Sequence, residues 1–499
     1  VRFHISLPLQ AGRWKERHTG KRQISMKRIL TIFLALAYTF SYADAKEIKG
    51  TVKDTEGNAI SGVVVSDGLL TTVTDSKGRF EIDPDQDSRF IFISTPAGYS
   101  SSTSAGNESY FMAIGRNAKK SYDFIVRKKE KDDTRHNLIA FADPQISEAD
   151  ELPQLEEQTK AMGEFVKSMD SDETFAICLG DLVGWDHRLY PGIKKAFDQV
   201  GIPMRIVMGN HDMTCWGNQF EGSAKDFEDA FGPAWYSFNV GKVHYVVLNN
   251  NFFIGRDWFY IGYLEQRQLR WLERDLSYVP AGSTVVVSVH IPTTLWESDR
   301  EAFSYNDISE IMSNKKALYE RLAPYKAIIL SGHTHTSMNQ IITPDLMEQN
   351  ISGLCGAWWC GPYCIDGTPI GWKAIEFDGD KVTWQFKSSG KPLDHQMKVY
   401  VDDDEYKGYT VANIWDYDPM WKVEYFEDGV KVCDMERFKG YDPAAKNYYS
   451  PATGKFKREW VCAYPTWNMF RASLSPDAKV IEVRVTDRFG RVYRQEINR

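Results

Sequence analysis

The middle of the chain alternates short apolar runs with segments of helical periodicity. Apolar runs occupy residues 138–142, 174–179, 204–208, 285–289 and 327–330, and helix-like segments fall at about 154–169, 192–199, 265–278 and 314–322. Strands that alternate with helices predict a largely parallel sheet with both faces covered. Because such sheets bind ligands at the carboxyl ends of their strands, functional side chains are expected directly after the apolar runs.

The regions on either side show a shorter period. Residues 47–127 alternate apolar and polar positions between turn signals, for example at 54–58 and 75–78. Short strands at this spacing are typical of a β-sandwich, and residues 391–499 show the same alternation. The charged stretch 128–133 is typical of a linker. The pattern therefore predicts an N-terminal β-sandwich at 46–130, a central α/β domain at 131–390 and a C-terminal β-sandwich at 391–499.

The first 45 residues predict an export signal. Residues 1–25 contain no Met, whereas Met26-Lys27-Arg28 is followed by an apolar run at 29–40 and by Ala43-Asp44-Ala45. This order is typical of a secretory signal peptide, and the run is shorter than the ~20 residues of a membrane-spanning helix. We therefore interpret 1–25 as an upstream annotation extension and 26–45 as a signal peptide cleaved near Ala45. The prediction is a periplasmic or secreted protein without a membrane span; an ordinary N-terminal helix of a cytosolic protein is the alternative.

Net charge and cysteine spacing limit which ligands and cross-links are expected. The whole chain has a formal net charge of −8, and the predicted mature chain has 52 Lys+Arg against 66 Asp+Glu, a net of −14. An acidic chain lacks the basic surface that binds nucleic acid, so no nucleic-acid partner is predicted. The seven cysteines contain no Cys-x-x-Cys pair, which argues against a structural zinc site. Cys360 with Cys364, or Cys433 with Cys462, are the disulfides that an exported protein could form.

Five short motifs follow the five apolar runs. They are Asp143-Pro144-Gln145, Gly180-Asp181, Gly209-Asn210-His211-Asp212, His290 and Gly332-His333-Thr334-His335. We expect eight polar side chains to converge at one rim of the sheet, namely Asp143, Gln145, Asp181, Asn210, His211, His290, His333 and His335. A lone histidine after an apolar strand is more often structural, but the order and context of all five motifs favour a metal site.

These residue types suit two divalent cations. Two cations about 3.5–4 Å apart need a bridging carboxylate and a bridging hydroxide, and the pair stabilises the attacking and leaving oxygens of a displacement at phosphorus. Asp181 is the candidate bridge. Asp143, Gln145 and His335 are the candidate ligands of one cation, and Asn210, His290 and His333 are those of the other. His211 is left over, and we interpret it as the general acid that protonates the leaving group.

The motifs resemble those of the calcineurin-like metallophosphoesterases over residues 134–390. The family pattern is Asp-x-His, Gly-Asp-x-x-Asp, Gly-Asn-His-Asp/Glu, a lone His and Gly-His-x-His. The chain departs from it twice, because Gln145 replaces a His and Gly184 replaces the second Asp. The missing carboxylate would normally orient the catalytic His, and Asp186 and Asp212 are the two candidates to replace it. The neutral oxygen of Gln145 favours Mn²⁺, Mg²⁺ or Fe over Zn²⁺ at the first site, and the identity of both metals stays open.

The resemblance also implies the architecture. It implies an α/β fold with a four-layer α/β/β/α core flanked by two β-sandwich domains, as in secreted bacterial members with three domains. Residues 50–80 resemble a carboxypeptidase-regulatory-like sandwich, and residues 391–499 resemble the C-terminal domain of those members. Gln145 is similar to the equivalent residue in two branches of the family. One branch contains manganese-dependent ADP-ribose/CDP-alcohol diphosphatases, and the other contains protein phosphatases with Asp-Pro-Gln.

Two long connections are expected to select the substrate. Residues 293–306 contain Trp296, and residues 353–371 contain Trp358 and Trp359. Connections of this length are usually functional. Their tryptophans could stack on a base, a sugar or a lipid-linked group, or they could close a domain interface.

The histidines outside the motifs are interpreted without a catalytic role. His244 lies inside an apolar run and is predicted to be structural. His136, His187 and His395 are predicted to be solvated.

The sequence thus predicts a secreted, metal-dependent phosphoric ester hydrolase with two divalent cations drawn from Mn, Fe, Mg and Zn. Cleavage of a phosphodiester or diphosphate is the leading prediction, because Gln145 is similar to the diphosphatase branch and the long loops could hold a second substituent. A phosphomonoesterase, including a protein phosphatase, is the alternative enzyme. An inactive glycan- or protein-binding module is the alternative outside the enzymes, and the presence of His211 with a nearly complete ligand set argues against it.

Overall fold

The computed structural model describes residues 47–101, 103–104, 107–115, 121–169, 173–215, 219–255, 259–295, 305–454 and 456–499. The predicted extension and signal peptide, and Trp296 with most of its loop, lie outside these residues. Residues Glu47–Arg499 form one compact unit. Within the described part of the chain, no helix is both long and apolar enough to cross a membrane.

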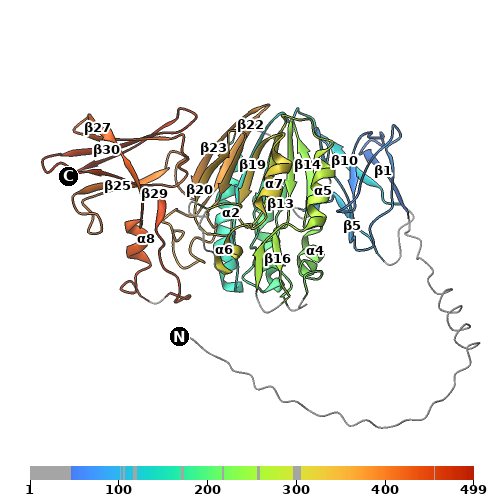
Figure 1. Cartoon of the computed structure of the whole chain (residues 1–499), viewed down its shortest axis with the longest axis horizontal. Helices are drawn as coiled ribbons and strands as arrows, with labels where there is room; N and C mark the ends of the chain where they lie inside the picture. The colour runs from blue at the N-terminus through green and yellow to red at the C-terminus, as the bar shows by residue number, and fades with distance from the viewer. Residues whose placement is uncertain are drawn as a thin grey trace, which may run out of the picture. The chain divides into compact units, whose positions relative to one another are not determined.

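Two sheets form the centre of this unit (Figure 1). The seven-stranded sheet has the order β23 (Lys381–Ser388), β22 (Gly371–Asp378), β11 (Arg135–Phe141), β12 (Thr174–Cys178), β13 (Met204–Ile206), β8 (Asn107–Glu108) and β7 (Thr103–Ser104). The six-stranded sheet has the order β14 (Tyr236–Val240), β15 (Val243–Val247), β18 (Thr284–Ser288), β19 (Lys326–Ser331), β21 (Leu346–Asn350) and β20 (Met338–Thr343). A separate antiparallel pair, β16 (Asn251–Phe253) and β17 (Tyr260–Gly262), lies between β15 and β18 in sequence.

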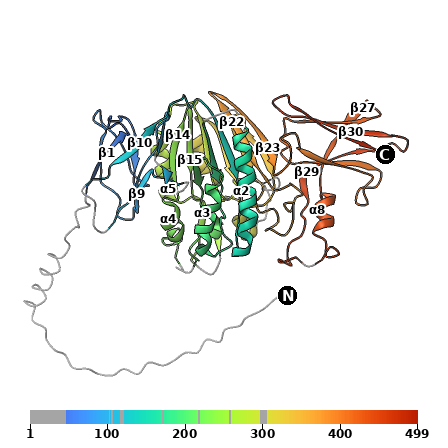
Figure 2. The ribbon, with the colours of Figure 1, turned by 180° about the vertical axis from the view of Figure 1, so that it is seen from behind.

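The two sheets pack face to face, and helices cover their outer faces. Phe175 of β12 and Tyr245 of β15 meet between the sheets with ring centroids 5.1 Å apart. Helices α2 (Leu152–Lys167) and α3 (Tyr190–Asp198) cover one outer face (Figure 2), and α5 (Gln266–Leu276) and α7 (Lys315–Leu322) cover the other (Figure 1). The four-layer α/β/β/α prediction is therefore confirmed.

The helices form where apolar residues recur on one face. In α2, Leu155 and Met162 are seven residues apart and pack against Ile139 and Phe141 of β11. Burial on both faces explains why the central parallel strands read as nearly continuous apolar runs. The sequence did not predict the short helices α4 (Lys225–Phe231), α6 (Tyr305–Glu310) and α8 (Pro443–Tyr448).

The N-terminal flank consists of two four-stranded sheets. One has the order β4 (Arg79–Ile82), β1 (Ile48–Asp54), β10 (Phe124–Lys128) and β6 (Tyr99–Ser101). The other has the order β3 (Thr71–Val73), β2 (Val64–Ser66), β5 (Phe90–Ile93) and β9 (Phe111–Ala113). This flank packs on α5, where the Trp271 indole donates to the Ser66 hydroxyl at 3.0 Å.

The C-terminal flank also consists of two four-stranded sheets. One has the order β24 (Met397–Val401), β25 (Tyr409–Ile414), β29 (Thr466–Ser473) and β28 (Glu436–Gly440). The other has the order β27 (Val430–Asp434), β26 (Lys422–Glu427), β30 (Val480–Thr486) and β31 (Val492–Asn498). Lys373 of β22 holds this flank through a buried ion pair with Asp416 at 2.7 Å. The core therefore lies between two β-rich domains, as predicted.

Two smaller predictions concern histidines and cysteines. His244 is buried and bonded to Asn239 and Asp275, which confirms a structural role. The prediction that His136 is solvated is wrong, because its ring is buried, stacks on Phe377 and lies 2.6 Å from the Tyr245 hydroxyl. His187 and His395 are partly buried. All seven cysteines are free thiols, so neither suggested disulfide forms in the structure.

Candidate active site

Five strands deliver the five motifs to the same region. Strand β11 is parallel to β12, and β12 is parallel to β13. In the second sheet, β18 is parallel to β19. Each of these strands ends one to three residues before its motif, so the motifs leave the carboxyl ends of parallel strands at a shared rim.

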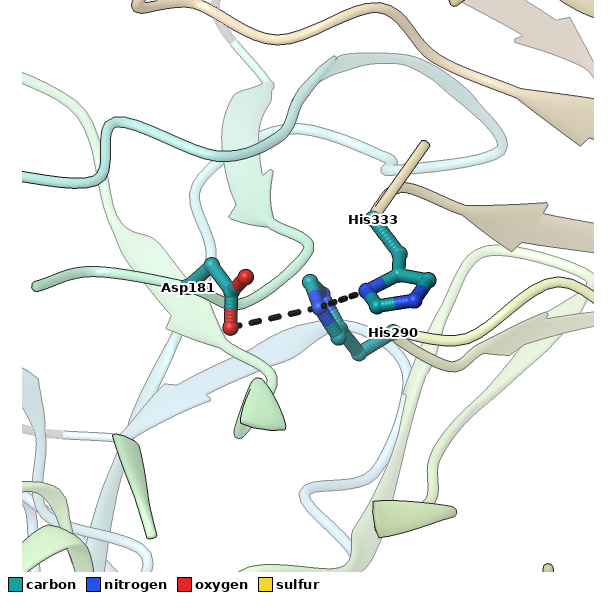
Figure 3. Close-up of side chains that lie close together, drawn as sticks. All are labelled: Asp181, His290 and His333. Carbon is teal, nitrogen blue, oxygen red and sulfur yellow. Dashed lines mark hydrogen bonds and ion pairs between the residues drawn. The ribbon is translucent and has the colours of Figure 1, made fainter. Parts of the chain in front are cut away.

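The best-defined donor cluster is centred on His290 (Figure 3). Its Nε2 atom lies 2.9 Å from Asn210 Oδ1, 3.2 Å from Asp181 Oδ1 and 3.2 Å from His333 Nδ1. The ligand atoms of Asp181, His290 and His333 all lie within 4.8 Å of one another. Three of these four residues are buried, and His333 is half-buried. Nitrogen and oxygen donors that converge in this way fit a divalent transition-metal ion.

Hydrogen bonds outside the cluster set the orientation of the imidazoles. His290 Nδ1 donates to the Leu179 carbonyl at 2.7 Å, and His335 Nδ1 donates to the Gly356 carbonyl at 3.1 Å. Because a carbonyl oxygen only accepts, Nδ1 carries the proton in each ring. In its neutral form, each ring then presents an Nε2 lone pair to the site, as metal-ligating histidines commonly do.

The second group of predicted ligands surrounds Asp143. His335 Nε2 lies 3.7 Å from Asp143 Oδ1, and the backbone N–H of His333 donates to Asp143 Oδ2 at 2.9 Å. The backbone N–H of Gln145 donates to the Asp181 carbonyl at 2.8 Å. The Gln145 side-chain oxygen is buried without a hydrogen-bond partner among the described residues. A buried amide oxygen without a donor is costly, and a cation would satisfy it.

The backbone at this rim is unusual. Five predicted ligands have left-handed φ angles: Asp143 at 51°, Gln145 at 37°, Asp181 at 52°, His333 at 74° and His335 at 53°. Such conformations are uncommon outside glycine and concentrate at functional sites. Glycines permit the close approach of the turns, because a Cβ at Gly209 would lie 2.2 Å from Asp181 Oδ1 and one at Gly332 would lie 2.8 Å from Asp143 Oδ2.

His211 also contacts Asp181, the candidate bridging carboxylate. Its Nε2 is 3.9 Å from Asp181 Oδ2, and its backbone N–H donates to Asp181 Oδ1 at 2.8 Å. Its Nδ1 is buried without a hydrogen-bond partner of good geometry in the described part of the chain. The Trp185 ring packs on it with centroids 4.2 Å apart.

The two acids suggested as replacements for the missing carboxylate have other partners. Asp212 accepts hydrogen bonds from the backbone of Gly209 and Leu182 and from the Tyr190 hydroxyl. Asp186 pairs with Arg188 at 2.8 Å. At position 184 itself, a Cβ would lie 2.1 Å from the Ser147 hydroxyl oxygen and 2.9 Å from Ser147 Cβ. The departure from the family pattern at Gly184 therefore accompanies a close packing contact with Ser147.

Burial and neighbouring charges shift the pKa values of the carboxylates and imidazoles at the site. Burial opposes the charge of Asp181, but His290 and His211 hold its pKa below the ordinary range. Burial raises the pKa of Asp143 well above its ordinary value, and the charge of Asp181 adds to this shift. Burial lowers the pKa of His333 to about 3 and that of His335 to about 4. Neutral imidazoles suit metal binding, and a cation would favour the charged form of both carboxylates.

Sequence reasoning did not place three tryptophans near the site histidines. Trp358 was noted as a loop residue, and the structure stacks it on His335 at 4.2 Å. Trp460, from the C-terminal flank, contacts Trp358 at 4.4 Å. Trp185 follows Gly184 directly, so its place beside the Gly-Asp motif was the available signal. No local pattern marks Trp460, because its contacts lie about a hundred residues away in sequence.

Comparison with protein families accounts for nearly all of the described chain. The family model described as "Calcineurin-like phosphoesterase" matches residues 136–337. The models for the N terminal and the C terminal of calcineurin-like phosphoesterase match residues 46–129 and 348–493. The chain belongs to the calcineurin-like phosphoesterases. For this phosphoesterase, membership supports the hydrolase class inferred from the motifs.

Several curated proteins are similar to this phosphoesterase. The serine/threonine-protein phosphatase CPPED1 of Homo sapiens is 25% identical over 51% of this chain and 79% of its own length. CPPED1 of Mus musculus is 30% identical over 36% of this chain and 58% of its own. The solved structure of a dimetal phosphatase from Danio rerio covers 51% of this chain and 97% of its own, with 13% identity and a TM-score of 0.37. The two CPPED1 proteins carry phosphatase names, which bears on the choice of substrate below.

Proposed function

We propose that this protein hydrolyses a phosphodiester or diphosphate with the help of two divalent cations. The observation that supports this proposal best is the donor cluster around His290, whose Nε2 atom lies within 2.9–3.2 Å of donor atoms of Asn210, Asp181 and His333. Asn210, His290 and His333 would hold one cation, and Asp143, Gln145 and His335 would hold the other. Asp181 would be shared between them.

The two cations would supply an activated water and neutralise charge on the phosphoryl oxygens. The protein's own contribution is to fix the donors before substrate arrives. Left-handed turns hold the carboxylates, and the carbonyls of Leu179 and Gly356 fix the imidazole tautomers. Ligands that are fixed in advance need little reorganisation during the reaction.

His211 is proposed as the general acid. It contacts the shared carboxylate Asp181 but is not needed to complete either ligand group. The packed Trp185 ring limits its motion on one side. From this position its Nε2 can donate a proton to the oxygen of the departing group, which makes alkoxide leaving groups easier to expel.

The diester preference rests on Gln145 and on the aromatic side chains near the site. A diester carries a second organic group that must be accommodated beside the metals, and Trp185 and Trp358 border two of the candidate site histidines. A phosphomonoesterase acting on phosphoprotein is the second candidate, because the curated relatives CPPED1 are named serine/threonine-protein phosphatases.

The substrate test compares ester classes, and its simple diester and monoester probes share one leaving group. Purified protein reconstituted separately with Mn²⁺, Mg²⁺, Fe²⁺ or Zn²⁺ would be assayed with bis(p-nitrophenyl) phosphate, p-nitrophenyl phosphate, a nucleoside diphosphate sugar and a phosphoserine peptide. We expect the highest kcat/KM on a diester or diphosphate. A higher value on the monoester or the phosphopeptide would replace the leading proposal with the second candidate.

The metal assignment has a separate test in Asp181→Asn. A neutral amide cannot hold two cations together, so we expect loss of most bound metal and of nearly all hydrolysis. Asp186→Asn is the control, because it removes a nearby carboxylate that pairs with Arg188. Metal content measured by elemental analysis and hydrolysis rates would be compared for both variants. Full metal content and normal turnover in Asp181→Asn would refute the assignment.

A further inference from the structure

The wall of the candidate site beside His335 is made of two tryptophans from different domains. Trp358 stacks on the His335 ring with centroids 4.2 Å apart and planes 21° apart. Trp460 meets Trp358 at 4.4 Å and 71°. Trp460 is thus two ring spacings from a candidate metal ligand, although it belongs to the C-terminal flank.

Trp460 is too exposed for its only role to be packing at the interface between two domains. Trp460 is 59% exposed, whereas Trp359 next to Trp358 is 9% exposed and donates to the Pro144 carbonyl. Closing a domain interface would bury a tryptophan, as it does for Trp271 against the N-terminal flank. A large exposed aromatic surface beside a polar site is typical of a ligand contact.

Ion pairs and a hydrogen bond connect the segment before Trp460 to the central domain. The Arg458 guanidinium pairs with Glu151 at 2.7 Å and donates to the Trp358 carbonyl at 2.6 Å. Lys457 lies 2.9 Å from Asp150 and 3.4 Å from Glu151. Glu151 is almost fully buried, and its other oxygen accepts from the Ser147 backbone, two residues after Gln145. One carboxylate therefore ties the Trp460 segment to the loop that carries two candidate ligands.

The backbone conformation of Trp358 also supports a ligand-binding role. Trp358 and Trp359 have left-handed φ angles of 50° and 60°. Bulky residues rarely adopt this conformation unless the surroundings enforce it, and such residues cluster at ligand sites. The enforcing contacts are present here, because Arg458 binds the Trp358 carbonyl and Pro144 accepts from the Trp359 indole.

We propose that Trp460, supported by Trp358, binds a ring on the organic group of the phosphoester, so that the C-terminal domain determines the substrate class. This inference rests on the proposed phosphoesterase site, since it places the phosphorus at the metals. A flat aromatic ring, such as a base or an aryl group, and a sugar ring both offer an apolar face to an indole. A linear alkyl group offers none.

The experiment measures binding of stable phosphonates, so it does not depend on turnover. Metal-loaded full-length protein would be titrated calorimetrically with phenylphosphonate, cyclohexylphosphonate and propylphosphonate. These probes share the phosphoryl head and differ in the attached group. Four proteins are compared: the natural chain, Trp460→Ala, Trp460→Phe and Tyr409→Ala. Tyr409 is an exposed aromatic residue of the same domain whose ring faces Arg471.

We expect Trp460→Ala to weaken phenylphosphonate relative to propylphosphonate by about tenfold, the size of one stacking interaction. Trp460→Phe should restore most of this preference, and Tyr409→Ala should leave it unchanged. An equal loss for the phenyl and cyclohexyl probes identifies a ring face of the sugar type, and a loss confined to the phenyl probe identifies a base or aryl group. A ring-to-propyl ratio that Trp460→Ala does not change overturns the inference.

The two proposals fail in different ways. If no ester is hydrolysed with any metal but the ring preference depends on Trp460, the proposed function is wrong and the ring site stands. If esters are hydrolysed and the ring preference is absent, the ring site is wrong and the proposed function stands.

Discussion

The contact between Gly184 and Ser147 gives a prediction whose size follows from the structure. A Cβ at position 184 would lie 2.1 Å from Ser147 Oγ, 2.9 Å from Ser147 Cβ and 3.2 Å from Ser147 Cα. The backbone cannot easily move apart here, because the Gly184 N–H donates to the Ile146 carbonyl at 2.8 Å and Ile146 pairs with Val183. Gly184→Ala is therefore expected to cost about 1–3 kcal/mol, the usual range for overpacking.

The cost should decrease as the side chain of Ser147 is shortened. In Ser147→Ala/Gly184→Ala the contact at 2.9 Å persists, so relief is partial; in Ser147→Gly/Gly184→Ala the nearest remaining atom is at 3.2 Å. Ser147→Gly alone costs about 0.5–1 kcal/mol in backbone entropy. The double-mutant cycle subtracts this cost and isolates the contact.

The assay is thermal unfolding of the four variants. An overpacking cost of about 2 kcal/mol corresponds to a fall in Tm of about 4–8 °C for a domain of about 150–250 residues. Gly222→Ala is the control, because its Cβ would meet only the flexible Gln219 side chain, with Nε2 at 3.3 Å and Cγ at 3.7 Å. If Gly184→Ala melts with the natural protein, or if Ser147→Gly/Gly184→Ala melts no higher than Gly184→Ala, the contact does not exclude a side chain at this position.

Three further predictions concern the site and the core. His211→Ala should keep its metals and lose about 10²–10⁴-fold in rate, mostly on esters with poor leaving groups; a parallel loss of bound metal in elemental analysis would make His211 a ligand. Gln145→His should shift metal preference toward Zn²⁺ and alter the diester-to-monoester ratio of kcat/KM; unchanged selectivity and ratio would show that Gln145 tunes neither. Burial lowers the pKa of His136 from 6.5 to about 4, so its neutral ring contributes fully to stability above pH 6.5 and this contribution falls as pH drops toward 4. The free energy of unfolding should therefore fall by about 2 kcal/mol more between pH 8 and pH 5 in the natural protein than in His136→Phe, measured with denaturant; equal slopes for both proteins would contradict the assignment.

The sequence predicted best what depends on local burial. The central strands are buried on both faces, so their apolar runs were visible, and the motif after each run could be located to the residue. Periodicity alone suggested one sheet, because nothing local shows that β11 and β18 belong to different sheets. The four layers came from the family resemblance.

What the sequence could not predict depends on contacts between distant residues. His136 is buried because Tyr245, 109 positions later, bonds to its ring. Gly184 departs from the family pattern where Ser147, 37 positions earlier, occupies the space beside it. Trp460 lies next to Trp358 in a segment where Arg458 binds Glu151 across 307 positions. A single sequence gives no signal for such pairings.

The left-handed backbone at five candidate ligands has a consequence for how this chain could change over time. A non-glycine residue in that conformation costs about 1 kcal/mol or more, and a typical domain is stable by only about 5–15 kcal/mol. Replacing Gln145, His333 or His335 by Gly or Asn would relieve this conformational cost but would remove a candidate ligand. The chain still carries Asp, Gln and His at all five positions. At this rim the stability of the fold and the supply of donor atoms therefore oppose each other, so stabilising substitutions at these five positions are expected to remove metal-binding capacity.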